Sequence, residues 1–397
     1  MLDIALVVIV IVTGAILLWP RVSKAPLWRA TITPLASIIG SGFLVLGPIL
    51  DNSYGHLAPL VMAALCLVAY LFGFAVRYNI AVIDEGEDKR GPMEQRLDTL
   101  SSWVLAFAYV ISVSYYLNLF GAFGVSLTPV DGKIAARILT TAVFVAILGV
   151  GWFYGFKAME RMEQISVGIK LAIIAALLAG LGWYFFGHVS AGTLIFNPPT
   201  LSGLHAITLG FGLIVTVQGF ETSRYLGNTY DARTRIRSMR LSQWLSTAIY
   251  MVYIVFLSYV FAKGDFALTE TAIIDMMQVV APILPALLVL AALSAQFSAA
   301  VADTSGSGGL IAEQTAGRVP EPAAYALLVV IGILLTWTLD VFEIISYASR
   351  AFALYYAIQA AVAATAANRK GHRKLSIALL ALAIFGALIF LFGEPAE

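Results

Sequence analysis

The chain has 397 residues, of which 60% are hydrophobic and only 12% are charged, and its formal net charge is +1. The mean hydropathy is +0.89, and apolar runs of about 20 residues, the length of a membrane-spanning helix, recur along the whole chain. This composition indicates an all-α polytopic membrane protein and excludes a β-barrel, whose strands alternate in short segments. The charge balance gives no indication of a nucleic-acid partner.

About twelve transmembrane helices are expected. The first begins with Asp3 rather than a basic segment and has no small-residue cleavage site, so we interpret it as a true span and not as a signal peptide. The twelve apolar runs lie near residues 2–19, 29–50, 56–80, 99–126, 134–155, 162–187, 204–227, 241–263, 281–312, 321–339, 341–367 and 374–393.

Lysine and arginine are concentrated in alternate loops, which predicts that these loops face the cytoplasm. This places both the N-terminus and the C-terminus outside, in a membrane that we expect to be a bacterial inner membrane, with lipid as the surrounding partner. No phosphate-binding loop, zinc-ligand spacing or nucleophile motif occurs in the sequence. We therefore expect no enzyme activity, no cofactor and no metal site.

The second apolar run is interrupted by small residues in "ASIIGSGFLV", at Ile39, Gly40, Ser41 and Gly42. Glycine weakens a helix by about 1 kcal/mol relative to alanine. An unwound segment at mid-membrane exposes free amides at the positive end of a half-helix dipole, which suits an anionic group. The alternative is close helix packing through small residues.

The seventh run is interrupted in the same manner, in "GFGLIVTVQGFETSRYLG". Gln218, Gly219, Phe220 and the intramembrane Glu221 lie at this second break, five spans after the first. Paired broken spans are typical of an inverted-repeat secondary transporter that binds substrate between the breaks. We divide the chain into an extra helix (1–28), two five-helix repeats (29–187 and 188–367) and a C-terminal helix (368–397).

Four stretches resemble the amino acid–polyamine–organocation (APC) superfamily and together cover most of residues 29–367. "IIGSGFLV" is similar to its first core helix, "GFKAMERMEQISVGIKLAII" to the fifth, "VQGFETSRYLGNTYDARTRIRSMR" to the sixth with its loop, and "GSGGLIAEQTAGRVPEPAAY" to the link between the eighth and ninth. The resemblance implies a LeuT-like 5+5 fold, transport by alternating access, and an amino acid whose carboxylate meets the first broken helix. The chain departs from the family pattern in its extra first span and in lacking Glu-x-x-x-Pro after the sixth core helix.

Ionisable residues within spans are candidates for the coupling mechanism. A charged side chain at the bilayer centre costs free energy, so it is usually paired or functional. By the resemblance, Lys170 and Asp303 lie on the core helices that flank the sodium position of sodium-coupled members, where an ammonium would replace the ion. Burial disfavours the charged lysine and a carboxylate favours it, which allows proton exchange. The residues leave open whether Lys170 snorkels instead, and whether Asp303 pairs with it, binds sodium with Ser298 and Thr304, or caps a break.

Each remaining candidate has a functional and a structural interpretation. Glu221 gates the site, relays a proton or binds a substrate amine, or it ties down loose backbone amides. Tyr109 lines the pocket or packs between helices. Glu343 and Arg350 are seven residues apart on one helix face. Glu343 is expected as a gate near the outer mouth, and Arg350 as a ligand of a carboxylate or as a structural partner of an acid.

These observations predict a secondary transporter of a small amino acid, a related zwitterion or an organic ion, coupled to protons or working by exchange. A sodium-coupled symporter, a channel and a membrane sensor that reuse the same bundle remain as alternatives.

Overall fold

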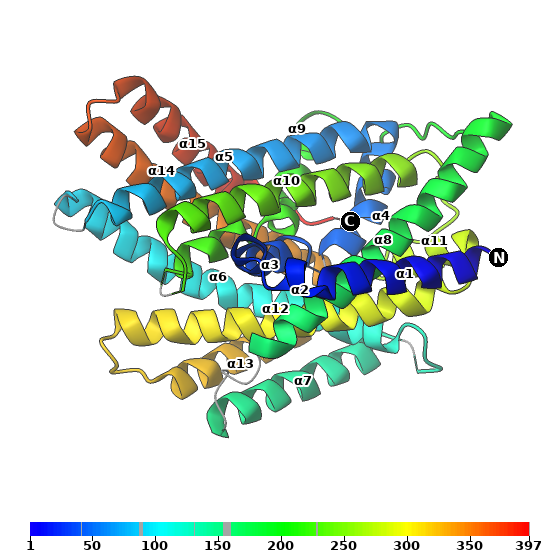
Figure 1. Cartoon of the computed structure of the whole chain (residues 1–397), viewed down its shortest axis with the longest axis horizontal. Helices are drawn as coiled ribbons and strands as arrows, with labels where there is room; N and C mark the ends of the chain where they lie inside the picture. The colour runs from blue at the N-terminus through cyan, green and yellow to red at the C-terminus, as the bar shows by residue number, and fades with distance from the viewer. Residues whose placement is uncertain (41, 87–89, 131, 154–159, 228, 397) are drawn as a thin grey trace.

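The structure is a computed structural model that describes residues 1–40, 42–86, 90–130, 132–153, 160–227 and 229–396, with the backbone alone for 160–165. Every regular element in these ranges is helical, and the helices form one bundle whose long helices run along a common direction (Figure 1). Seven of the described helical segments are long and apolar enough to cross a membrane by themselves.

The first half of the chain contains a first continuous helix, then the first broken span, then four more continuous spans. Its elements are α1 (Leu2–Leu18), α2 (Pro20–Ser23), α3 (Pro26–Ile38), α4 (Gly42–Tyr54), η1 (Gly55–Leu57), α5 (Ala58–Asp84), α6 (Pro92–Val125), α7 (Lys133–Phe153) and α8 (Glu160–Ala191).

The second half repeats this order, with a broken span followed by continuous ones. Its elements are α9 (Gly203–Gly212), η3 (Ile214–Val217), η4 (Phe220–Tyr225), α10 (Ala232–Leu257), α11 (Ala272–Val280), α12 (Leu284–Gln314), α13 (Glu321–Thr338), α14 (Val341–Arg369) and α15 (Arg373–Phe392). Each predicted span coincides with one helix or with the segments of a broken one. The short helix α11 was not predicted.

Several helices begin where the sequence supplies a start signal. Pro26 and Pro92 occupy the first turns of α3 and α6, where the missing N–H has no intrahelical partner to lose. The Asp231 carboxylate accepts a hydrogen bond from Thr234 N at 2.8 Å and caps α10. Asp340 and Glu343 form a reciprocal capping box at the start of α14.

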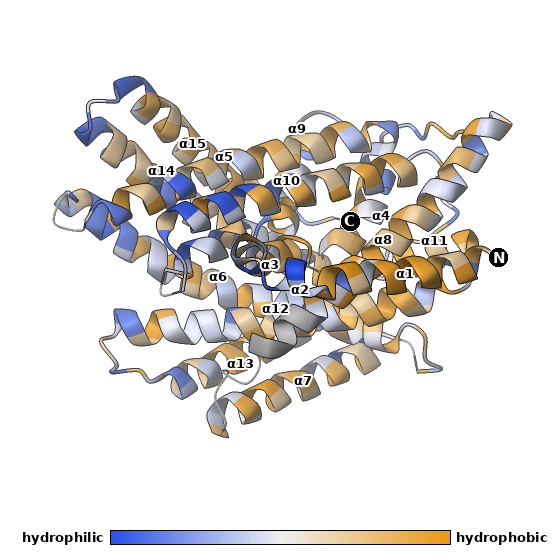
Figure 2. Cartoon of the chain, viewed as in Figure 1, coloured by the Kyte–Doolittle hydropathy of each residue, from blue (hydrophilic) through white to orange (hydrophobic). Residues whose placement is uncertain are grey.

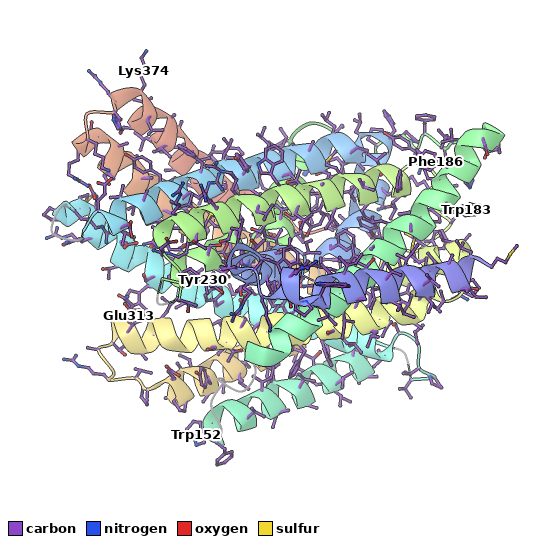
Figure 3. All side chains as sticks on the ribbon, viewed as in Figure 1. Trp152, Trp183, Phe186, Tyr230, Glu313 and Lys374 are labelled. Carbon is purple, nitrogen blue, oxygen red and sulfur yellow. The ribbon has the colours of Figure 1, made fainter. Side chains whose placement is uncertain are left out.

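The helices are arranged around α6 and α14, which pack against each other, with α12 on α6 and α15 on α14. α1 lies along α8 (Figure 1), and the Asp3 carboxylate accepts a hydrogen bond from Ile283 N at 3.4 Å. Trp152, Trp183 and Phe186 point away from the bundle (Figure 3) and are exposed. In a bilayer such aromatic rings anchor a protein at the membrane surface.

One end of the bundle is hydrophilic, where α5 meets α6 and α14 meets α15 (Figure 2). At this end Arg369 Nε donates to Glu94 Oε1 at 2.7 Å and Lys370 Nζ donates to Glu85 Oε1 at 2.6 Å. Lys133 and Arg137 lie at the other end, beside Asp340. We refer to the first as the basic end.

Gly121 provides a test of the close packing between α6 and α7. A methyl group there would lie 2.4 Å from the Ala136 carbonyl oxygen, whereas one at Gly149 on α7 would meet no atom within 4 Å. We expect Gly121→Ala to destabilise the protein by about 1–3 kcal/mol through overpacking. Thermal unfolding in detergent measures the difference, with Gly149→Ala as the control, and equal melting temperatures would contradict it.

Candidate functional site

The first predicted break is confirmed. α3 ends at Ile38 and α4 begins at Gly42, and between them Ile39 leaves the helical conformation, with φ −85° and ψ 58°. Gly40 is also non-helical, whereas Gly42 is the first residue of α4. Ser41 lies outside the described residues.

The second break is also confirmed, and it requires glycine. α9 ends at Gly212, Gln218 is extended, and Gly219 adopts φ +117°, a conformation that side chains other than glycine rarely tolerate. A methyl group at Gly219 would also lie 2.5 Å from Ser37 Cβ on α3. The glycine thus permits both the turn of its own chain and the close approach of the other broken span.

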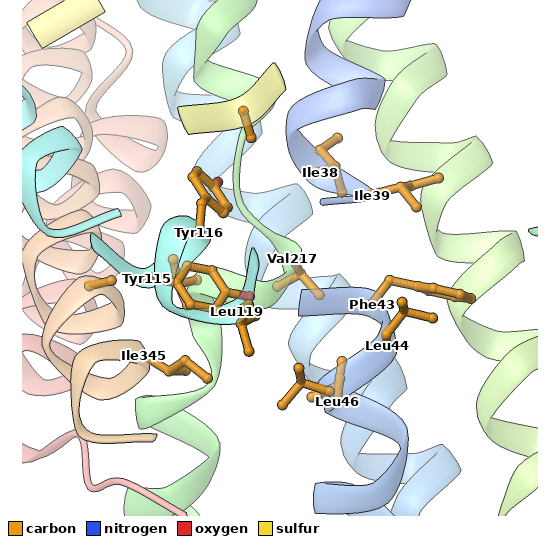
Figure 4. Packing of buried hydrophobic residues seen from close by; sticks show 14 of the residues in the cluster. Ile38, Ile39, Phe43, Leu44, Leu46, Tyr115, Tyr116, Leu119, Val217 and Ile345 are labelled. Carbon is orange, nitrogen blue, oxygen red and sulfur yellow. The ribbon is translucent and has the colours of Figure 1, made fainter. Parts of the chain in front are cut away.

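The two breaks pack directly against each other. Gly219 faces Ser37 and Ile38, while a methyl group at Gly42 would lie 3.0 Å from Thr216 Cβ and 2.8 Å from the Tyr115 hydroxyl. Figure 4 shows Val217 of the second break between Tyr115 and the first broken span. Each break therefore depends on a glycine that admits the backbone of the other.

Side chains from neighbouring helices satisfy the backbone carbonyls that the breaks release. The Tyr250 hydroxyl on α10 lies 2.9 Å from Ile38 O and 2.5 Å from Thr216 O, so it contacts both breaks. Ser349 Oγ on α14 donates to Gly212 O at 2.7 Å and accepts from Val215 N at 3.0 Å. Unwound backbone at membrane depth is tolerated only with such partners.

Lys170 on α8 also binds this released backbone. Its side chain is buried, with 2% exposed, and Nζ donates to Ala36 O at 2.9 Å, in the last turn of α3. The C-terminal end of a helix carries the negative end of its dipole, so an ammonium is favoured there. The alternative interpretation, that Lys170 snorkels to the membrane edge, is wrong for this structure.

Comparison with known proteins identifies the family that this architecture represents. A family model described as APC superfamily transporter matches residues 20–393. The chain belongs to the APC superfamily of transporters. An uncharacterized protein of Aquifex aeolicus (strain VF5) is 38% identical over 385 residues, which cover 95% of this chain and 93% of the relative. Membership in the APC superfamily implies the LeuT-like fold and a transport function rather than an enzymatic one.

Glu221 of the transporter combines a backbone contact with a free carboxylate oxygen. Its Oε2 accepts from Gly219 N at 3.0 Å and from the Tyr356 hydroxyl at 2.6 Å. Its Oε1 is fully buried and has no hydrogen-bond partner among the described residues. The carboxylate thus stabilises the second break and keeps one oxygen available at the site.

Asp303 on α12 accepts a hydrogen bond from Ser112 on α6 rather than pairing with Lys170 in the described part of the chain. The predicted oxygen ligands beside it bond to their own helix, because Ser298 Oγ donates to Ala295 O and Thr304 Oγ1 to Ala300 O.

Aromatic rings enclose the second break. Phe220 stacks on Tyr356 with ring centroids 5.0 Å apart, and the Tyr356 hydroxyl lies 3.3 Å from Gln218 Oε1. Tyr109 on α6 contacts Phe352 edge to face, with ring centroids 5.9 Å apart. Phe352 in turn lies 6.4 Å from Tyr356, centroid to centroid. Gln218, Phe220 and Glu221 therefore meet at Tyr356, and Tyr109 lies on the far side of Phe352.

Among the residues that the structure describes, Arg350 meets neither an acid nor the first break. Its Nε donates to Phe390 O at 2.7 Å near the end of α15, and its side chain lines a largely apolar cavity of about 720 Å³. The physical reason is that α15 packs along α14 and presents its terminal carbonyls to Arg350. Glu343 Oε2 accepts from Asp340 N at 2.8 Å and lines a separate cavity of about 470 Å³.

Sequence reasoning did not find a largely buried polar network near the basic end. Asp98 at the start of α6 accepts hydrogen bonds from Arg224 of η4 and from Arg90, the latter at 2.9 Å. Arg224 also bonds Gln359 of α14, and Gln359 Nε2 donates to Ser101 Oγ at 2.7 Å. These residues are distant in sequence. The available signal was that Arg224 closely follows the second break.

Sequence reasoning also missed Tyr250, Ser349, Tyr356 and Ser112, because single polar residues of these types are common within apolar spans. Among the described side chains, no three His, Cys, Asp or Glu residues come close enough together to hold a metal ion.

We expect Tyr250→Phe to lower the free energy of unfolding by about 1–3 kcal/mol, because two buried carbonyls at the breaks lose a donor. Tyr259→Phe is the control, since the Tyr259 hydroxyl donates to His56 O at an exposed position. Melting temperatures of the two variants in detergent measure the difference. An unchanged melting temperature for Tyr250→Phe would show that the breaks do not depend on this contact.

Proposed function

We propose that this APC superfamily member is a secondary active transporter of a small amino acid, a related zwitterion or an organic ion, coupled to protons through Lys170. The proposal rests on one observation above all, the Lys170 ammonium bound to Ala36 O at the end of the broken helix α3. The substrate would bind at the breaks, beside the free oxygen of Glu221 and the ring of Tyr109.

The position of Lys170 supports proton rather than sodium coupling. An ammonium that donates to a helix-terminal carbonyl performs the task that a bound cation performs, which is to hold the unwound end of the helix. Loss of its proton removes the charge and weakens the hydrogen bond to Ala36 O, which releases α3. A second cation beside the charged lysine would be repelled.

Alternating access would then proceed by movement at the basic end. α3 packs against η4, whose Arg224 joins the network with Asp98 and Gln359. Release of α3 would loosen this network and open the site there, with repeats 29–187 and 188–367 rocking against each other. The excess of lysine and arginine at the basic end supports placing it in the cytoplasm and both termini outside, in a bacterial inner membrane.

A ligand panel tests the transport function. The purified protein is heated with amino acids, amines and carboxylates at several pH values, with and without sodium, because a ligand that binds the folded state raises the melting temperature. Ligands that stabilise the protein are then assayed for uptake into proteoliposomes. Stabilising ligands that are never taken up would contradict transport, and stabilisation only with sodium would favour the sodium-coupled alternative.

Lys170→Ala tests the coupling. We expect wild-type uptake to depend on pH without requiring sodium, and the variant to lose the pH dependence while still binding substrate. Uptake into proteoliposomes across pH 5–8 measures this, with Lys374→Ala, at an exposed lysine near the start of α15, as the control. Sodium-stimulated uptake by the wild type, or an unchanged pH profile in Lys170→Ala, would instead favour a sodium site at Asp303, Ser298 and Thr304.

Gly42→Ala and Gly40→Ala are a matched pair of variants that test the substrate site. A methyl group at Gly42 would press on Thr216 of the other break, whereas one at Gly40 would meet Ser37 O at 3.3 Å and Tyr116 at 3.6 Å. We expect Gly42→Ala to reduce uptake at least tenfold and Gly40→Ala to reduce it much less. Size-exclusion chromatography checks that both remain folded. Equal activity of the two variants would show that contact between the breaks is not required.

A further inference from the structure

The residues after α15 turn back into the bundle instead of leaving it. Glu394 N donates to Thr208 O of α9 at 3.0 Å, and the Thr208 hydroxyl donates to Glu394 Oε2 at 2.6 Å. The hydroxyl of Ser346 on α14 donates to Gly393 O at 3.3 Å. In Figure 1 the C-terminal mark lies within the outline of the bundle. We call residues 393–396 the tail.

The helices beside the tail are fitted to it. A methyl group at Gly212, the last residue of α9, would lie 1.8 Å from Glu394 O, so only glycine leaves room for the tail. The bond from Arg350 Nε to Phe390 O holds the last turn of α15, from which the tail departs. Arg350, which lies away from the breaks, thus positions the tail.

The tail forms part of the wall of the 470 Å³ cavity lined by Glu343. Pro395 and Ala396 face Asn118 and Ala122 of α6 across this space, which Lys133, Arg137, Asp340 and Glu343 also line. Ala396 is buried, with only 8% exposed. We call this cavity the vestibule. It lies at the end of the bundle opposite the basic end, and its floor at Asn118 is close in sequence to Tyr115, which contacts Gly42 at the first break.

We propose that the tail is a gate that closes the vestibule to solvent, and that it must leave α9 and α14 before substrate can reach the broken helices through the vestibule. The role of this gate in transport rests on the proposed function, whereas the attachment of the tail to α9 and α14 is seen in the structure. The tail blocks the route beside α9 and α14, while the Asp98–Arg224 network closes the basic end. With both the tail and the Asp98–Arg224 network in place, the protein is in an occluded state.

The attachment of the tail suits a gate because it is polar and local. The Thr208 hydrogen bond lowers the pKa of the Glu394 carboxyl below its usual range, so the group is ionised at neutral pH. His205 Nδ1 also lies 3.4 Å from Glu394 Oε2, and both side chains are largely exposed. Few hydrogen bonds must break for the tail to leave, and water can replace each of them.

Cysteine labelling tests the gate without requiring transport. In a Cys66→Ser background, Ala122→Cys places a thiol in the vestibule, and its reaction rate with a charged maleimide is measured in detergent. We expect a chain that ends at Gly393 to react at least tenfold faster than the full chain. An unchanged rate would overturn the proposal. Because the assay needs no substrate, a failure here is distinguishable from a failure of the transport function.

Two further variants keep the test decisive if the shortened chain is unstable. Gly212→Ala should displace the tail and accelerate labelling, whereas Gly210→Ala should not, since its methyl group would lie 3.6 Å from the nearest atom, the Tyr54 hydroxyl. Equal rates for the two glycine variants would contradict the gate.

Discussion

The contact between the two broken helices is the constraint on which the rest of the structure depends. Gly219 fits against Ser37 and Gly42 against Thr216, with no room for a side chain at either glycine. Such close packing ends the regular helical hydrogen bonds of both spans near the centre of the bundle. Several released carbonyls then take a donor from a neighbouring helix, because the apolar surroundings supply none.

The buried polar side chains follow from that requirement. Tyr250 contacts carbonyls of both breaks, Ser349 binds the end of α9, and Lys170 binds the end of α3. Among these groups only Lys170 carries a charge, and the loss of one proton removes it. Deprotonation would therefore weaken the hydrogen bond from Lys170 to α3 while the other hydrogen bonds at the breaks remain. This difference links the architecture of the breaks to the proposed coupling mechanism.

The structure brings some of the predicted site residues together and leaves others apart. Gln218, Phe220 and Glu221 meet at Tyr356, as their common place in one break indicated. Arg350 was placed on the correct helix, but its contact depends on how α15 packs, and hydropathy gives no information on packing. The partner of Asp303 likewise came from α6, almost two hundred residues away, where one serine among many supplies the hydrogen bond.

The sequence by itself determined the class of protein and the position of both breaks. These features follow from local causes, namely the apolar length needed to cross a bilayer and the weak helix-forming tendency of glycine. The tertiary structure decided which carbonyl Lys170 binds, which acid Arg224 meets and where residues 393–396 lie. Those contacts join segments far apart in the chain, and their free energy depends on three-dimensional packing that no local pattern records.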